Sequence, residues 1–536
     1  MSKTRRSPLL TIPAVIAACA LLGGAFGPEL SIAAAASEDE RIQQSFRQFS
    51  RVLATIEANY ADEVDPEKAI FQGAIPQMLQ TLDPHSQFFD PEAFERLRDD
   101  QRGNYAGVGM TIQNRNGQTV VLHPFPKTPA YKAGLRPGDV VVEVDGEEME
   151  GLNTTEVANK LRGPEGTDVV VGYERPGKDG LTKVTVTRAR IPRPSVPVHF
   201  EIQDRVGFIK VESFNENTGK ELDRALDELN SDTLEGLILD LRGNRGGLLS
   251  QGVYVSDKFL DKGQKIVSHH GRASNERSYD AQRGSVGLEF PIIVMVNCQS
   301  ASASEIVAGA LQDHDRAVII GTPTFGKGLV QTVYPLGDTT GLALTTARYY
   351  TPSGRLIQRR YDGVSMVDYY NDPCSDHYKP KTDEVRKTDA GRTVFGGGGI
   401  TPDIQISEQR LNDFQIALRR AFAIENFAQH YVVTHPDLEE GWDPNDDVVE
   451  QFRQFLHGED FEFTEVDFSE NVDFIKRFLK REVYVSAYDL DEGEKVYYAL
   501  DPDVEKALEA LPKARQLLES PSRLVAEQLE SERVGR

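Results

Sequence analysis

Residues 291–321, PIIVMVNCQSASASEIVAGALQDHDRAVIIG, carry the clearest structural pattern in the chain. An apolar run, PIIVMV, passes through a serine-rich turn into the helix-like SEIVAGALQD and ends in a second apolar run, RAVIIG. This order predicts two parallel strands joined by a helix. The same alternation recurs across residues 199–405, so an α/β core with a partly parallel sheet is expected there.

Three serines lie where the first apolar run turns into the helix. Ser302 and Glu305 fit the S-x-x-E capping box, so capping the helix is one role open to Ser302. Nucleophilic attack on a carbonyl is the other, because N–H groups at a helix start can bind the developing oxyanion.

The stretch GTPTFGKG, residues 321–328, has the glycine and lysine spacing of a phosphate-binding loop. Pro323 removes one N–H group, Gly328 replaces the required hydroxyl, and the following LVQTVY alternates like a strand, which argues against nucleotide binding. A solvated surface position is one reading of Lys327. The other is a dehydrated lysine between apolar strands, whose lowered pKa leaves a neutral amine to act as a base. Ser–Lys pairs are a known variant of serine catalysis.

A second glycine-rich turn, LILDLRGNRGGLL, follows an apolar strand at residues 237–249. Gly246 and Gly247 can turn their N–H groups toward a ligand without interference from a side chain. A tight turn between strand and helix explains the same glycines equally well.

Residues 103–190 consist of short β-like runs and glycine turns, and YAGVGM with AGLRPGDVVVEVDG resembles a PDZ domain. In that family the first loop binds the carboxylate of a peptide, which adds as a β-strand. The corresponding loop residues here are Gly107, Val108, Gly109 and Met110.

The whole series of motifs resembles the tail-specific, or carboxyl-terminal processing, serine proteases over roughly residues 40 to 405. The stretches that carry this resemblance are LDPHSQFFDPEAFERLRDDQRGNYAGVGM, LRGPEGT, LDLRGNRGG, SASASEIVAGALQDHDRAVIIGTPTFGKGLVQ, YYTPSGRLIQ and GGGGITPDI. Cys298–Gln299 and Asn244–Arg245 depart from the family pattern beside these motifs, without replacing a residue that has a role.

The resemblance implies Ser302 as nucleophile, Lys327 as general base and Gln331 as the orienting partner of the lysine. On a strand Lys327 and Gln331 would share a face. The remaining implied residues are the oxyanion donors Ala303 and Gly247, with Gly246 a weaker candidate, and the regulatory Arg162. No cofactor or metal is implied.

The first 36 residues combine a basic start, an apolar run and the small residues IAAAA, which is typical of a secretory signal cleaved after Ala36. A retained membrane anchor and lipidation at Cys19 are the alternatives, and each exports the protein to the cell envelope or periplasm. Beyond this segment only Cys298 and Cys374 remain, too few for a disulfide framework. The net charge of −24 argues against nucleic acid as a partner.

The expected protein is therefore an α+β multidomain chain. Its parts are a signal or anchor (1–36), an N-terminal helical domain (38–99), a small β-barrel-like PDZ domain with helices (100–190), a ClpP/crotonase-like Ser–Lys protease core (191–407) and a helical C-terminal extension (408–536). The expected function is an exported endopeptidase that captures protein C-termini. A homodimer and an adaptor protein are further candidate partners. A non-catalytic PDZ scaffold and a protease based on His85–Ser86 are the rival readings.

Overall fold

The computed structural model describes residues 40–522, apart from 116, 176, 179, 286, 372–373, 375–380, 408–409 and 440. It divides the chain into two compact units, Met1–Leu82 and Asp83–Arg536. The expected signal segment, 1–36, lies outside the described residues. Within the described part, no helix combines the length and apolarity that crossing a bilayer requires.

The first unit is helical in its described part. A helix over residues 40–59 is followed by a short run whose elements are α2 (Pro66–Lys68), the π-helix η2 (Ala69–Ala74) and α3 (Ile75–Gln80). Asp65 begins this run by accepting hydrogen bonds from the N–H groups of Glu67 and Lys68. An N-cap carboxylate of this kind satisfies donors that have no partner within the helix.

A six-stranded sheet forms the centre of the second unit. In spatial order its strands are β10 (Val198–Gln203), β11 (Val206–Lys210), β12 (Gly236–Asp240), β15 (Ile292–Val296), β16 (Ala317–Gly321) and β21 (Ile404–Gln405). Only the β10–β11 pair is antiparallel, and the other neighbours are parallel. The α/β core predicted from the strand and helix pattern is confirmed.

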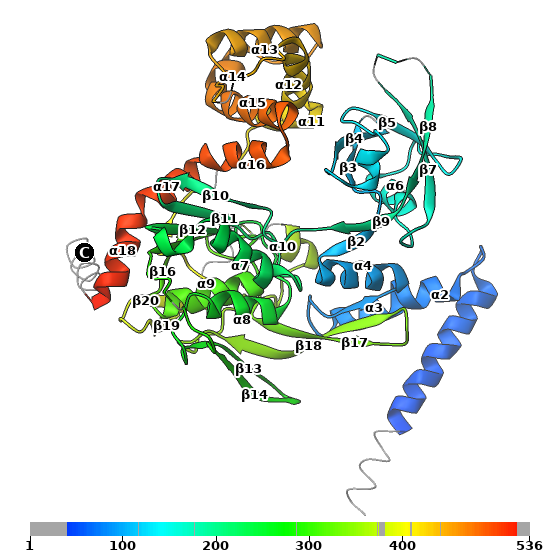
Figure 1. Ribbon diagram of the computed structural model, residues 1–536. Coiled ribbons are helices and arrows are strands. Elements are labelled where there is room, and N and C mark those ends of the chain that lie inside the picture. The colour runs from blue at the N-terminus through cyan, green and yellow to red at the C-terminus, as the bar shows by residue number, and fades with distance from the viewer. Residues whose placement is uncertain are drawn as a thin grey trace, which may run out of the picture. The chain divides into compact units, whose positions relative to one another are not determined.

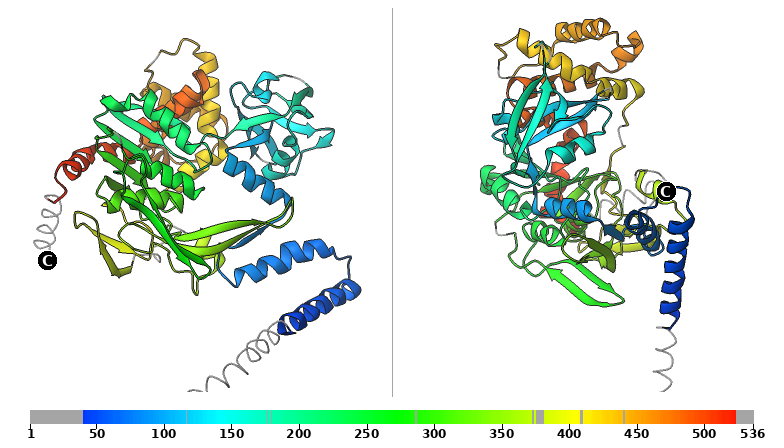
Figure 2. Two further views of the ribbon diagram at one scale, coloured as in Figure 1. Left: turned by 60° about the horizontal axis from the view of Figure 1, so that its bottom comes forward. Right: turned by 90° about the vertical axis from the view of Figure 1, so that its right-hand side faces the viewer.

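Helices cover both faces of this sheet (Figure 1). The helices on one face are α7 (Thr218–Glu228), α8 (Leu249–Asp257) and α9 (Ala303–Asp313), and on the other α17 (Pro502–Glu509) and α18 (Leu511–Glu519). Successive side chains along a strand point to opposite faces of the sheet. Leu237 and Leu239 therefore enter the first core, whereas Ile238 enters the second. The second core also contains Val504 and Leu517. Figure 2 gives the same arrangement from two further sides. The central strands are therefore apolar on both faces, as parallel sheets require.

A second, antiparallel sheet packs beside the core. Its strands are β1 (Gln87–Phe89), β13 (Lys265–Gly271), β14 (Ser274–Asp280), β17 (Leu329–Pro335) and β18 (Gly341–Tyr350), with β1, β13 and β17 all pairing with β18. Strand β1 interrupts the stretch whose pattern indicated helices only. The Asp90–Pro91 dipeptide then starts α4 (Pro91–Arg102), which Asp90 caps.

The PDZ region has its own core. Its elements are β3 (Met110–Arg115), β4 (Gln118–Pro124), α5 (Pro129–Lys132), β5 (Val140–Val144), β6 (Glu147–Glu148), α6 (Thr154–Leu161), β7 (Asp168–Glu174) and β8 (Thr182–Thr187). The described strands run in the order β3-β4-β5-β7-β8, with β6 on β5, so they form an open sheet rather than a closed barrel. A two-stranded ribbon, β2 (Asn104–Gly107) with β9 (Ala189–Pro192), stands at the start and end of this region.

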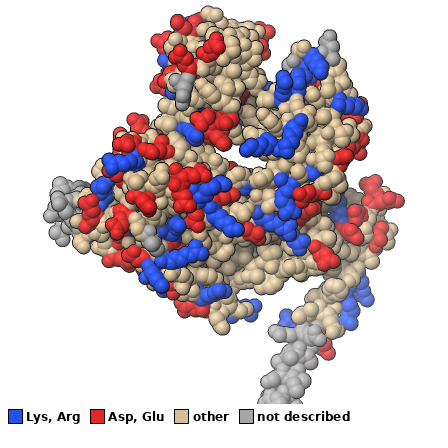
Figure 3. Space-filling model, in the orientation of Figure 1, with Lys and Arg blue, Asp and Glu red and all other residues tan. Residues whose placement is uncertain are grey.

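The helical C-terminal region is confirmed. It contains α11 (Asp413–Ala421), α12 (Ala423–Thr434), α13 (Asp446–Gly458), α14 (Glu465–Glu470), α15 (Val472–Ala487) and α16 (Leu490–Ala499). An aromatic-rich core that includes Phe414, Phe427 and Phe452 holds α11 to α15 together. Acidic and basic side chains are interspersed over the face drawn in Figure 3, and acidic ones gather on this lobe.

Candidate active site

Ser302 lies between the end of β15 and the start of α9, at the turn predicted to carry the nucleophile. Its backbone has φ +56° and ψ −113°, an unusual conformation for a residue with a side chain. Such a conformation costs on the order of 1–3 kcal/mol and is found where the surrounding structure imposes it, often at functional sites. Ala303 follows as the first residue of α9.

Glu305 joins the serine turn to the lysine loop. One carboxylate oxygen, Oε2, accepts hydrogen bonds from the N–H groups of both Ser302 and Lys327, each at 2.8 Å. The other, Oε1, accepts from the N–H of Gly326 at 2.7 Å and from the hydroxyl of Thr324 at 2.6 Å. The side chain is fully buried. Burial raises its pKa, while these four donors act in the opposite direction. The sequence pattern identified Glu305 only as half of a capping box.

Tyr349 makes a second bridge between the same two segments. Its hydroxyl lies 3.1 Å from the carbonyl oxygen of Ser302 and also contacts the carbonyl oxygen of Lys327. Tyr349 is 1% exposed and comes from β18. The N–H and C=O groups of both residues are thus held by buried side chains. Tyr349 opens the stretch YYTPSGRLIQ quoted above, but the sequence assigned it no role.

The Lys327 amine donates to Oε1 of Gln331, the partner that the family resemblance implied, at 2.7 Å. The amide of Gln331 donates in turn to the carbonyl oxygen of His85. Burial lowers the pKa of Lys327, and the negative charges of Glu305 and Asp83 only partly oppose this. The site therefore favours a neutral amine of fixed orientation.

His85 lies beside this group but is held by tyrosines. Its Nε2 lies 3.0 Å from the hydroxyl of Tyr369, and its Nδ1 lies 2.9 Å from that of Tyr370. Burial lowers its pKa from 6.5 to about 3, with a further contribution from Lys327 when that amine is protonated, so His85 is neutral. Ser86 donates to Asp83 at 2.8 Å instead of to the histidine. This geometry does not favour a His85–Ser86 catalytic pair.

The glycine turn after β12 lies directly against the serine. A Cβ atom placed on Gly246, whose φ is +94°, would be 2.7 Å from Cβ of Ser302. The N–H of Gly246 donates to the side chain of Asn244 at 2.8 Å. The N–H groups of Gly247 and Ala303, by contrast, have no acceptor among the described residues. Within the described part of the chain, the N–H of Ala303, adjacent to Ser302, and that of Gly247, adjacent to Gly246, are thus not used.

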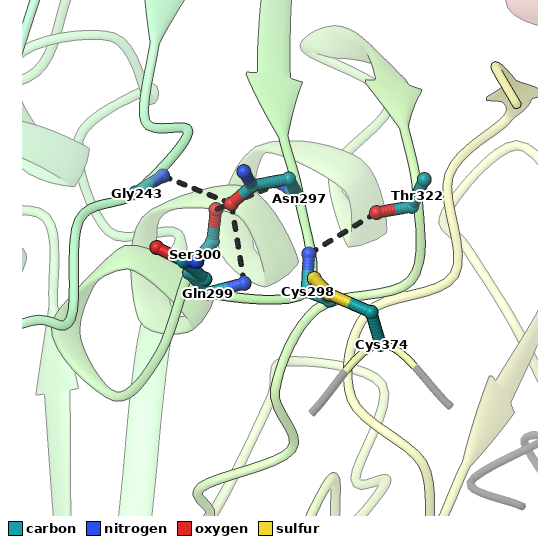
Figure 4. The surroundings of a disulfide bond; sticks show 7 residues. All are labelled: Gly243, Asn297, Cys298, Gln299, Ser300, Thr322 and Cys374. Atoms are coloured by element: carbon teal, nitrogen blue, oxygen red, sulfur yellow. Dashed lines mark hydrogen bonds between the residues drawn. A yellow bond between two sulfur atoms is a disulfide. The ribbon is translucent and has the colours of Figure 1, made fainter. Parts of the chain in front are cut away.

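The disulfide between Cys298 and Cys374 stands four residues before the serine (Figure 4). The sequence alone gave no reason to pair two cysteines 76 residues apart. Figure 4 also shows that Asn297 accepts hydrogen bonds from the N–H groups of Gly243 and Gln299. The serine segment is therefore tied to the glycine turn on one side and to the chain around Cys374 on the other.

In the GVGM loop of the PDZ region, the backbone lies close to neighbouring segments. The carbonyl oxygens of Val108 and Gly109 accept from the N–H groups of Ala130 and Phe125 at 2.8 and 2.9 Å. The N–H groups of the same two residues have no acceptor in the described part of the chain. Gly109 has φ +79°, and a Cβ there would be 2.5 Å from Thr128.

Arg162 follows α6 and lies near the start of this loop. Its guanidinium carbon is 5.3 Å from the ring centroid of Tyr105, a cation–π contact. Its N–H donates to the carbonyl oxygen of Ala158 at 3.0 Å, which closes the last turn of α6. These contacts place the predicted regulatory arginine beside the loop.

Comparison with known families agrees with both parts of the fold. Residues 205–366 match Peptidase family S41, and residues 121–175 match the PDZ domain family. The first match contains Ser302, Lys327 and Gln331. The chain is a serine-type peptidase with a PDZ domain.

Two curated relatives share most of their length with it. The carboxy-terminal-processing protease of Bartonella bacilliformis is 40% identical over 345 residues, which are 63% of this chain and 78% of the relative. Carboxy-terminal processing protease CtpB of Bacillus subtilis is 32% identical over 380 residues, 67% and 79% of the two chains. A solved structure, the photosystem II D1 C-terminal processing protease, is 28% identical, with a TM-score of 0.35 and coverage of 67% of this chain and 92% of that one. The chain belongs to the carboxy-terminal processing proteases of Peptidase family S41.

Proposed function

We propose that the chain is an exported endopeptidase in which Ser302 attacks the peptide carbonyl and Lys327 acts as general base. The observation that carries this proposal is a buried lysine with a lowered pKa, held by Gln331 and anchored through Glu305 to the backbone of Ser302. A charged amine could not accept the hydroxyl proton, whereas a dehydrated neutral one can.

In the proposed reaction Lys327 takes the Ser302 proton as Oγ bonds to the carbonyl carbon, which leaves a tetrahedral oxyanion. The N–H groups of Gly247 and Ala303 donate to that oxygen. Lys327 then gives its proton to the leaving amine as the C–N bond breaks. Water, deprotonated by the same amine, cleaves the ester and restores the serine hydroxyl.

We assign substrate capture to the PDZ loop from Gly107 to Met110. Its two N–H groups without acceptors suit the carboxylate of a protein C-terminus, and β3 provides a strand beside which the peptide can pair. Arg162 is the candidate residue that senses this binding, because it lies at the loop and ends the helix that flanks it.

Export rests on the basic and apolar residues 1–36, and the Cys298–Cys374 disulfide supports it, since disulfides persist in oxidising compartments. Sequencing the N-terminus of protein recovered from a periplasmic fraction tests cleavage after Ala36 against a retained anchor. The proposed domain division stays as given above, with α17 and α18 packed on the core sheet. A homodimer and an adaptor remain proposed partners, which size measurement and pull-down would test.

The dyad is tested with Ser302→Ala and Lys327→Ala on an unstructured protein substrate. Ser250→Ala and Lys220→Ala change an exposed serine and an exposed lysine and serve as matched controls. Cleavage is expected to persist in both controls and to vanish in both dyad variants. A serine-reactive phosphonate should modify only Ser302, as mapped by mass spectrometry. Retained cleavage in either dyad variant would remove the proposed mechanism.

A further inference from the structure

The C-terminal helices make a charged contact with the strand that leads into the glycine turn. Arg242 follows β12, and its Nη2 lies 2.9 Å from Oδ2 of Asp501. Its Nη1 lies 3.5 Å from Oδ2 of Asp503. Asp501 is also the N-cap of α17, where it accepts from the N–H of Asp503 at 2.9 Å. The start of α17 therefore faces Arg242.

Most of the charges in this contact are buried, and they balance one another. Arg242 also binds Oδ2 of Asp240 at 2.7 Å, and Lys210 lies 3.3 Å from the same carboxylate. Asp240 is 0%, Lys210 8% and Asp501 9% exposed. Lys506 lies 3.7 Å from Asp503 and completes the cluster. Its three cations and three carboxylates give a net charge of zero, whereas without Asp501 the cluster would carry +1. An unbalanced buried charge is expensive, so removal of one partner displaces the others or admits water.

Burial would raise the pKa of Asp240, but Arg242 and Lys210 outweigh it and bring the pKa to about 2. Asp240 therefore stays charged and holds Arg242 on the side of the sheet. It binds the same Nη2 group as Asp501, so the guanidinium is shared between the strand end and the helix start.

Hydrogen bonds to neighbouring segments hold the backbone from Arg242 to the glycine turn in place. The carbonyl oxygen of Arg242 accepts from Lys210, and the N–H of Gly243 donates to Asn297 at 2.9 Å. The carbonyl oxygen of Asn244 accepts from the N–H of Ala301, in the serine segment, at 3.0 Å. A shift of Arg242 would therefore reach the turn within five residues.

We propose that Asp501, aided by Asp503, is a positioning residue for the peptidase reaction. By holding Arg242 from the C-terminal helix, it sets the glycine turn so that the N–H of Gly247 meets the oxyanion formed at Ser302. The inference rests on the proposed function, in which that N–H is an oxyanion donor. It lies beyond the family match, which ends at residue 366, and gives the C-terminal region a part in the chemistry.

The test is Asp501→Asn in the full-length chain. Asparagine caps a helix as well as aspartate does, so α17 keeps its start while the charge on Arg242 is lost. Glu505→Gln, an exposed position of the same helix, removes one negative charge without touching Arg242 and is the control. Turnover of a quenched peptide is measured per serine titrated with a phosphonate, at a temperature where circular dichroism shows each variant folded.

The expected result is a kcat about 10-fold lower in Asp501→Asn with KM within twofold, and wild-type values in Glu505→Gln. The loss is smaller than the roughly 10²–10³-fold effect of deleting an oxyanion donor, because the donor is displaced rather than removed. Asp501→Glu should recover part of the loss. Should Asp501→Asn not fold, Asp503→Asn breaks the longer contact and is expected to lower kcat about threefold.

A lower melting temperature with unchanged kcat per titrated serine would overturn the inference and leave Asp501 as a purely structural residue. A rise in KM alone would overturn it equally. Ser302→Ala is run beside these variants. Cleavage by that variant would overturn the proposed function and this inference together, whereas an inactive Ser302→Ala with a fully active Asp501→Asn would overturn this inference alone.

Discussion

Replacing Glu305 by glutamine should separate the serine turn from the lysine loop. The carboxylate accepts three backbone N–H groups and the Thr324 hydroxyl. An amide has one oxygen, so its NH₂ group must take the place of the other. With the amide oxygen at the Oε2 position, Ser302 and Lys327 keep a neutral acceptor, while the N–H of Gly326 faces an NH₂ group.

The cost follows from these contacts. Two hydrogen bonds, from Ser302 and Lys327, change from a charged to a neutral acceptor at about 1 kcal/mol each, and the Thr324 hydroxyl turns to accept from the NH₂ group. The buried N–H of Gly326 loses its acceptor at about 1–3 kcal/mol. The sum is about 3–5 kcal/mol of unfolding free energy. Displacement of the lysine loop by about 1 Å would lower kcat by about 10²-fold.

The pH dependence of kcat/KM tests the role of Glu305 independently of stability. The Glu305 charge raises the pKa of Lys327, so the variant has a lysine of still lower pKa. Because the neutral amine is the base, the rising limb of kcat/KM against pH moves to lower pH even as the maximum falls. Both quantities are read from a quenched-peptide assay across pH 6–10, with urea unfolding for stability.

Glu221→Gln is the matched control, since this carboxylate also accepts several hydrogen bonds, from Ser195 and Val196, away from the site. It should lose stability and keep kcat. If Glu305→Gln unfolds within about 1 kcal/mol of the wild type and turns over at the same rate, the carboxyl group is protonated in the native protein, and the reasoning fails.

Three further outcomes are expected. Gly246→Ala should abolish most activity, because its Cβ would lie 2.7 Å from a backbone carbonyl oxygen. Gly243→Ala, also at positive φ but with nothing within 4 Å of its Cβ, should keep far more activity. Equal rates in the two variants would refute the steric account. The pKa of His85 is lowered from 6.5 to about 3, so as the pH falls below 6.5 the unfolded chain binds a proton that the folded protein does not, and the folded protein loses stability. Between pH 7 and 5 the free energy of unfolding of the wild type should fall by about 2 kcal/mol relative to His85→Gln. Urea midpoints that change in parallel in the two proteins would contradict this. Reduction of the disulfide, or Cys298→Ser with Cys374→Ser, should lower the free energy of unfolding by about 4.5 kcal/mol in the chain-entropy account for a 76-residue separation. The double variant should not respond to reductant.

Local pattern was sufficient for the elements that carry the chemistry. The apolar runs and the intervening helix of residues 291–321 appear as β15, α9 and β16. These features depend on neighbours in sequence, whose periodicity and turn residues are visible without tertiary information. The Lys327–Gln331 pair was implied only by the family resemblance, because residues four apart on a strand share a face but lie about 13 Å apart.

The remaining contacts depend on chain segments far apart. Tyr349 reaches Ser302 across 47 residues, and Asp501 reaches Arg242 from a helix whose own pattern shows only that it is amphipathic. Glu305 was visible in the sequence, but a capping box explained it fully until the lysine loop was placed beside it. Side-chain pairing of this kind follows from packing, which periodicity does not encode.

The covering of the central sheet by α17 and α18 bears on how the enzyme is made. On the ribosome, strands β11, β12, β15 and β16 emerge well before the residues that shield their second apolar face, such as Val504 and Leu517. Until those residues leave the exit tunnel, the second apolar face of the sheet has no covering helices, and Arg242 lacks its distal carboxylates. The central sheet therefore cannot be fully packed before the segment that carries α17 and α18 has been made.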